Sequence, residues 1–232
     1  LKMDRRITHR VVGGDGTQLA WHAHVGQDSR WSGPTVLLTN GIGTTEHFWR
    51  HLVDGLSGDH RVAHWDYRGH ASSELSRSGR YDMPVQADDL AQVSAALMAE
   101  GNGQAPVHVA FSMGVAVLLE LYRSRPELVR GMVLVAGAPD APGEGTALFR
   151  LPGTLAAVRS AVAALTPAVP LLAPVARLLM RSRLMYPAGR ALGVLQSGAP
   201  KKDIDLFLDR MARMDPLAYW LTLRGLMNAH AS

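Results

Sequence analysis

Two kinds of residue are scarce in this sequence, and cysteine is the first. There is none among the 232 residues, which excludes disulfide bonds and thiolate metal sites but says little about the cellular compartment. Residues 1–14 are charged and lack the apolar run of a secretory signal peptide. A cytoplasmic location is therefore expected. Position 1 is leucine rather than methionine, as in a fragment or a chain with an unusual start.

Acidic residues are missing from one long stretch. No Asp or Glu occurs between Gly145 and Lys202, which contains eight basic residues: Arg150, Arg159, Arg177, Arg181, Arg183, Arg190, Lys201 and Lys202. A positive potential from this block would favour anionic or membrane-surface substrates with an apolar tail. The alternative is that these side chains lie on a solvated face and aid solubility. Nucleic-acid binding is not expected, because the block has almost no aromatic residues and no recognition motif.

The rest of the composition fits one large α/β domain. Hydrophobic residues make up 47% of the chain and charged residues 19%, which allows a substantial buried core and excludes disorder. Strand-like and helix-like segments alternate. The expected strands are 7–12, 19–25, 34–39, 61–67, 107–111 and 132–136, and the expected helices are 48–56, 81–101 and 116–125. This alternation predicts a mostly parallel sheet with helices on both faces.

Ser112 lies at the junction of a predicted strand and a predicted helix. It follows the apolar run 107–111 and is flanked by small residues, with Gly114 two positions later. A serine in such a sharp turn has its hydroxyl exposed, and the N-terminus of the helix supplies free N–H groups and a partial positive charge. These are the requirements of a nucleophile. The alternative is an ordinary strand-to-helix turn.

Three motifs together resemble the α/β-hydrolase family. They are Asn40-Gly41-Ile42-Gly43 at the family's H-G-x-x loop, Asp66-Tyr67-Arg68-Gly69-His70-Ala71-Ser72 at D-x-R-G-x-G-x-S, and Ala110-Phe111-Ser112-Met113-Gly114 at the nucleophile elbow. The resemblance implies that Ser112 is the nucleophile and that the N–H groups of Ile42 and Met113 form an oxyanion hole. Asn40, Gly41, Gly43, Asp66, Arg68 and Gly114 would support these loops. Asn40 stands where the family usually has histidine, and Ala110 where it has glycine.

The resemblance also implies a helical cap. Residues 145–214 interrupt the alternation of strands and helices, so we expect an α/β core at 1–144, a cap at 145–214 and a return helix at 215–232. A membrane span is the competing interpretation, because residues 160–176 carry no charge. Prolines at 167, 170 and 174 interrupt this run, and it is shorter than the roughly 18 residues that a span requires. No transmembrane segment is therefore expected.

The family places an acid and then a histidine after the nucleophile. Asp140 follows the sixth predicted strand, where some members have the acid; a polar residue opening a Pro/Gly loop is the alternative. His230 ends an amphipathic helix and is interpreted as a surface residue. We therefore expect the histidine and the last strands to lie beyond Ser232. The chain as given would then be a poor catalyst, and its sixth strand would be an open edge available for self-association.

No metal site and no cofactor are predicted. The nine remaining histidines precede Ser112 and fit no metal-ligand spacing: His9, His22, His24, His47, His51, His60, His64, His70 and His108. The expected reaction is hydrolysis of an ester, thioester or lactone with an apolar portion, through an acyl-enzyme. Two other classes stay open, a non-catalytic binding or scaffold protein of the same fold and a cofactor-free haloperoxidase-like or acyl-transfer enzyme.

Overall fold

The structure is a computed structural model of the chain. It describes residues 5–25, 33–137, 154–182, 184–191, 195, 198 and 200–229.

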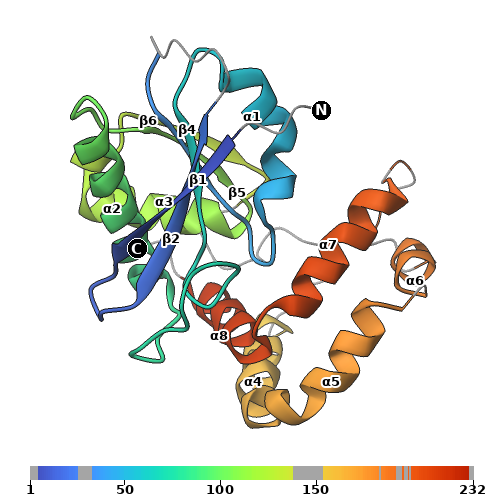
Figure 1. The fold of residues 1–232 in the computed structure, drawn as a ribbon. Coiled ribbons are helices and arrows are strands. Elements are labelled where there is room, and N and C mark those ends of the chain that lie inside the picture. The colour runs from blue at the N-terminus through green and yellow to red at the C-terminus, as the bar shows by residue number, and fades with distance from the viewer. Residues whose placement is uncertain are drawn as a thin grey trace.

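Six strands form one sheet in the order β1-β2-β4-β3-β5-β6 (Figure 1). Their bounds are β1 Arg5–Val12, β2 Gln18–Val25, β3 Val36–Thr39, β4 Val62–Trp65, β5 Val107–Phe111 and β6 Gly131–Val135. β2 pairs antiparallel with both β1 and β4, whereas the pairs of β3 with β4 and β5, and of β5 with β6, are parallel. The prediction of a mostly parallel sheet is confirmed.

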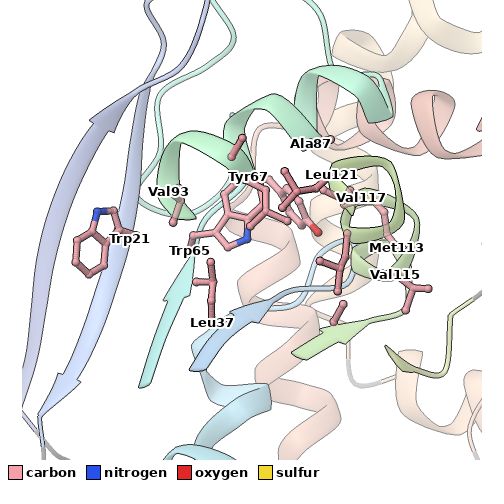
Figure 2. Close-up of a cluster of buried hydrophobic side chains, with 14 of the residues drawn as sticks. Trp21, Leu37, Trp65, Tyr67, Ala87, Val93, Met113, Val115, Val117 and Leu121 are labelled. Carbon is pink, nitrogen blue, oxygen red and sulfur yellow. The ribbon is translucent and has the colours of Figure 1, made fainter. Parts of the chain in front are cut away.

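Helices cover both faces of this sheet. On one face lie α2 (Met83–Glu100) and α3 (Met113–Ser124), and on the other lie the short 3₁₀-helix η1 (Glu46–Trp49) and α1 (Arg50–Leu56) (Figure 1). The α2–α3 side contains the larger buried cluster, in which Trp65 and Tyr67 meet side chains of both helices (Figure 2). Each fully buried apolar side chain of this kind contributes about 1.5–3 kcal/mol.

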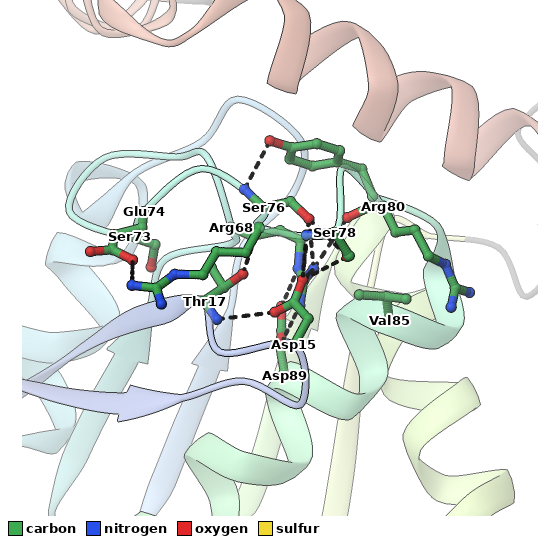
Figure 3. Close-up of polar contacts among 12 residues, drawn as sticks. Asp15, Thr17, Arg68, Ser73, Glu74, Ser76, Ser78, Arg80, Val85 and Asp89 are labelled. Atoms are coloured by element: carbon green, nitrogen blue, oxygen red, sulfur yellow. Dashed lines mark hydrogen bonds and ion pairs between the residues drawn. The ribbon is translucent and has the colours of Figure 1, made fainter.

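A buried ionic network holds the loop that follows β4. Arg68 is 1% exposed, and it donates hydrogen bonds of 2.7 Å from Nε and Nη2 to the two carboxylate oxygens of Asp89 on α2. Its Nη1 donates to Asp15 in the β1–β2 turn over 2.9 Å (Figure 3). Burial raises the pKa of Asp15, but hydrogen bonds from Ser78 and Thr17 outweigh it and hold that pKa well below its ordinary value. The network therefore joins three segments, namely the β1–β2 turn, the loop after β4 and α2.

The outer strand β6 has no neighbour on its far side within the part of the sheet that the structure describes. Val133, Leu134 and Val135 are all more than a third exposed. Self-association through this edge stays a prediction.

Beyond residue 153 the described chain is helical. The helices are α4 Thr154–Leu165, the 3₁₀-helix η4 Thr166–Ala168, α5 Val169–Met180, α6 Met185–Ala191, α7 Lys201–Arg213 and α8 Pro216–Met227. Asp215 caps α8, accepting a 2.8 Å hydrogen bond from Ala218 N, and Pro216 opens the helix. α8 lies against the core, because Leu226 joins the large buried cluster.

One helical stretch, Ala156–Met180, is long and apolar enough by length and composition to cross a membrane, with a mean hydropathy of 1.7. It is longer than the charge-free run noted in the sequence. In the structure η4 interrupts it at Thr166–Ala168, and its second half, α5, packs against α7 and α8.

Candidate active site

Ser112 occupies the turn between β5 and α3 in a strained backbone conformation. Its φ is +54° and its ψ −118°, a combination that costs a residue with a side chain about 1–3 kcal/mol. The turn is fixed from both sides, because Ser112 N donates to Val135 O over 2.9 Å and Val115 N donates to Ser112 O over 3.0 Å. Residues held in such conformations are often functional.

The glycine at position 114 is required by close packing. A Cβ atom at this position would lie 2.7 Å from the carbonyl oxygens of both Thr39 and Asn40. The first turn of α3 therefore approaches the end of β3 more closely than any other residue type allows. Ala110, in the place of the family's first glycine, is fully buried in β5, so its methyl group is accommodated.

Asn40 anchors the loop after β3. Its Oδ1 accepts a 2.6 Å hydrogen bond from Trp49 Nε1, and its Nδ2 donates to Trp65 O over 3.0 Å. Its backbone oxygen accepts a 2.6 Å hydrogen bond from the Tyr67 hydroxyl. Burial raises the pKa of Tyr67 well above its ordinary value, so this hydroxyl stays a donor. These contacts show how asparagine fits a position where the family usually has histidine.

The loop that Asn40 anchors lies directly against Ser112. A Cβ atom on Gly41 would be 3.1 Å from Ser112 Cβ and 2.8 Å from Phe111 Cδ1. The segment that contains Ile42 and the turn that contains Met113 are therefore neighbours. Two backbone N–H groups from such segments can stabilise an oxyanion. The assignment of the N–H groups of Ile42 and Met113 to that role stays a prediction.

Gly43 lies where this loop meets the helices beyond residue 200. Its φ is +72°, and a Cβ there would approach Tyr219 of α8 and Met211 of α7 to 3.2 and 3.3 Å. Glycine therefore satisfies both the backbone conformation and the close contact.

A pocket of about 280 Å³ opens beside Phe111, between the loop after β3 and α7. Phe48 stacks on Phe111 with 4.2 Å between ring centroids. The lining residues are Thr44, Thr45, His47, Phe48, Arg50, Phe111, Asp203, Ile204, Leu206, Phe207 and Arg210. The pocket wall is therefore largely apolar but includes the charged side chains of Arg50, Asp203 and Arg210.

Ion pairs join the two sides of this pocket. Asp203 accepts a 2.8 Å hydrogen bond from Arg50 Nη2 and lies 3.4 Å from His47 Nε2. The hydrogen bond from His47, together with the charge and hydrogen bond of Arg50, lowers the pKa of Asp203 despite the opposing effect of burial. Arg210 lies 3.6 Å from Glu46. No local sequence pattern marks these residues, because more than 150 positions separate the partners.

The acid and the base expected to assist the nucleophile are not among the described residues. Asp140 and His230 lie outside the residues that the structure describes. Among the described residues, no histidine or carboxylate is hydrogen-bonded to Ser112 Oγ. Asp66, by contrast, has a structural position: its Oδ2 contacts His22 Nε2 over 3.0 Å and accepts a hydrogen bond from Ser72 N over 3.1 Å.

Comparison with known proteins places this geometry in a family. Residues 34–215 match the family model of the alpha/beta hydrolase fold. The chain is 31% identical over 118 residues to RutD of Serratia proteamaculans (strain 568), a carbamate hydrolase candidate by name. That match covers 51% of this chain and 43% of RutD, so the chain spans less than half the length of this relative.

Solved structures agree in fold. A hydrolase from Pseudomonas aeruginosa PA01 superposes with a TM-score of 0.67 at 18% identity, covering 96% of this chain and 73% of that one. The enol-lactonase from Burkholderia xenovorans LB400 gives 0.64 at 18% identity, covering 94% and 74%. Because the family model matches most of the sequence and the strand order and elbow agree with it, the chain belongs to the α/β-hydrolase fold family.

Proposed function

We propose that the protein is a serine hydrolase that cleaves an ester, thioester or lactone with an apolar portion through an acyl-enzyme on Ser112. The observation that carries this proposal is the conformation of Ser112, whose φ of +54° is held at the β5–α3 turn with Gly41 in contact with it. Because the fold maintains this energetically costly backbone conformation at a serine, a reactive role for the residue is favoured over an ordinary turn.

The proposed reaction uses the backbone around this turn. Ser112 Oγ attacks the carbonyl carbon, its proton passes to a general base, and the carbonyl oxygen becomes an oxyanion near Ile42 N and Met113 N. Each such donor commonly stabilises the transition state by about 3–4 kcal/mol. The base gives the proton to the leaving oxygen or sulfur as the intermediate collapses, which frees the alcohol or thiol or, for a lactone, leaves it as a hydroxyl group on the acyl chain; water then hydrolyses the acyl-enzyme. We assign the base to a group outside the described residues, and His230 is the first histidine to test.

The pocket beside Phe111 supports a substrate with a compact apolar portion. Its volume of about 280 Å³ lies near the lower end of the range for small-molecule sites. Phe48, Ile204 and Phe207 supply apolar contacts. The similarity to RutD favours a carbamate as the second candidate substrate, because a carbamate presents the same attackable carbonyl.

Turnover of p-nitrophenyl esters from acetate to octanoate tests this proposal. In a form of the protein that carries the general base, we expect Ser112→Ala to reduce turnover by about 10³-fold or more, and Ser124→Ala, at the exposed end of the same helix, to leave it unchanged. His230→Ala, with His51→Ala on α1 as its control, tests whether His230 supplies the base: a loss in His230→Ala alone would identify it, and equal turnover in the two variants would assign the base to another residue. Turnover that survives Ser112→Ala would refute the nucleophile, and a folded wild type that binds esters without cleaving them would favour the non-catalytic alternative.

A further inference from the structure

A histidine–carboxylate cluster, which we define as His22, His64 and Asp66, is buried on the α1 side of the sheet. His22 on β2 and His64 on β4 are direct cross-strand partners, and Asp66 follows immediately after β4. Each of the three residues is less than 5% exposed to solvent. None of them lines the pocket beside Phe111, so the cluster is a separate site.

The three side chains converge. His22 Nε2 and Asp66 Oδ2 are 3.0 Å apart, and the imidazole rings of His22 and His64 stack with 4.6 Å between their centroids. One ligand atom from each of the three residues lies within 4.8 Å of the other two. The sequence spacing 22, 64, 66 predicted no metal site, because only the pairing of β2 with β4 brings these residues together.

Further contacts orient the two imidazole rings. His22 Nδ1 lies 2.9 Å from Thr8 Oγ1, which leaves Nε2 directed at Asp66. His64 Nδ1 lies 2.8 Å from His24 Nε2, and its Nε2 lies 4.0 Å from Glu46 Oε2. Metal-binding histidines typically have their second nitrogen fixed in this way by an outer hydrogen bond.

We propose that this cluster binds one divalent transition-metal ion of the zinc class, with a nitrogen of His22, a nitrogen of His64 and a carboxylate oxygen of Asp66 as ligands. Two imidazoles and one carboxylate are a donor set that suits Zn²⁺. Metal–ligand bonds of about 2.0–2.2 Å place neighbouring ligand atoms about 3.4 Å apart. The His22–Asp66 pair is already close to that separation, and the metal replaces the proton that the two atoms share.

The charges around the cluster are compatible with a cation. Asp66 supplies one negative charge. Glu46 supplies a second beside His64, and it is shared with Arg6 and Arg210. The side chain of Glu46 is a quarter exposed.

Zn²⁺ titration of the metal-stripped protein by isothermal calorimetry tests this inference, with metal content and melting temperature measured in parallel. We expect one ion per chain and a higher melting temperature with zinc. We expect His64→Gln and Asp66→Asn to weaken binding by about 100-fold or more. Two matched controls, exposed His51→Gln and buried His108→Gln, should bind as the wild type does. Circular dichroism verifies that each variant is folded.

The contact between Thr8 Oγ1 and His22 Nδ1 provides a test that leaves all three ligands in place. Thr8→Val removes the hydroxyl beside His22 Nδ1, and we expect zinc binding to weaken by about 10–100-fold while the fold is retained. This variant decides the question if a ligand substitution prevents folding. Absence of one-to-one binding in the wild type, equal loss in the control variants, or full affinity in Thr8→Val would overturn the proposal.

Discussion

The α/β core and the described helices α4–α7, which lie within the predicted cap (residues 145–214), differ in how firmly their side chains are held. In the core even charged groups are enclosed, as the Arg68–Asp89 pair shows. In the cap, α5 exposes most of its large apolar side chains: Leu171, Leu172, Val175, Leu178 and Leu179. A tightly packed core can maintain the strained turn at Ser112, whereas the described cap contributes chiefly the α7 wall of the pocket. In the proposed reaction, the core would hold the nucleophile, and side chains of both regions would line the substrate pocket.

We expect the largest loss of unfolding free energy when Arg68 in the core is substituted. Arg68→Ala leaves the Asp89 carboxylate buried and unpaired, and breaking a buried ion pair in this way costs about 3–5 kcal/mol. Urea denaturation measures this loss. The control is Arg77→Ala, because the Arg77 side chain is mostly exposed in its pair with Glu74, and we expect at most about 1 kcal/mol there. Equal losses in the two variants would contradict the enclosed network.

His108, buried in β5, predicts a pH-dependent stability of the core. Its Nε2–H donates to Leu128 O over 3.1 Å, and burial outweighs this contact and lowers the pKa to about 4. The unfolded chain takes up the proton below about pH 6.5, whereas the folded chain does so only below about pH 4. The stabilising contribution is therefore complete above pH 6.5, and about 3 kcal/mol of it is lost as the pH falls to 4.

Unfolding free energies between pH 7 and pH 4 measure this contribution in the wild type and in His108→Gln. The difference between the two proteins isolates His108 from the other buried histidines. We expect a shallower decrease in the variant. Identical slopes would show that His108 is not buried in its neutral form.

The sequence predicted the core well and the contacts between distant segments poorly. Motif spacing located the elbow at Ser112, and local alternation located the strands, because both depend on neighbouring residues. The expected strand 61–67 is shorter in the structure, Val62–Trp65, because Asp66 and Tyr67 turn away into side-chain contacts with His22 and Asn40. The Arg50–Asp203 pair and the His22–His64–Asp66 cluster could not be predicted from the sequence. They form only when β2 pairs with β4 and when Asp203 of α7 reaches Arg50 of α1.

Strain at Ser112 is expected to appear as a gain in stability when it is removed. Ser112→Gly and Ser112→Ala both lack the hydroxyl, but only glycine tolerates a φ of +54° without a Cβ penalty. We expect the glycine variant to be more stable than the alanine variant by about 1–2 kcal/mol. At Ser124, the last residue of α3, the order should reverse by at most about 0.5–1 kcal/mol. The same order at both positions would argue against strain in the turn.

We expect the smallest change in unfolding free energy at an exposed position of α5. Leu171 is 81% exposed, so Leu171→Ala should change the unfolding free energy by no more than about 0.5 kcal/mol. Leu37, fully buried in β3, is the matched core position, where Leu→Ala typically costs about 2–5 kcal/mol. Chemical denaturation of the two variants measures this contrast. A large loss at Leu171 would show that another surface covers α5.

Reaction with a fluorophosphonate probe, followed by mass spectrometry of the peptides, tests the central claim most directly. In a form of the protein that carries the general base, we predict one adduct per chain on Ser112, no adduct in Ser112→Ala and an unchanged adduct in Ser124→Ala. An adduct on a different serine, or a folded protein that hydrolyses esters while Ser112 stays unmodified, would contradict the assignment of Ser112 as the nucleophile.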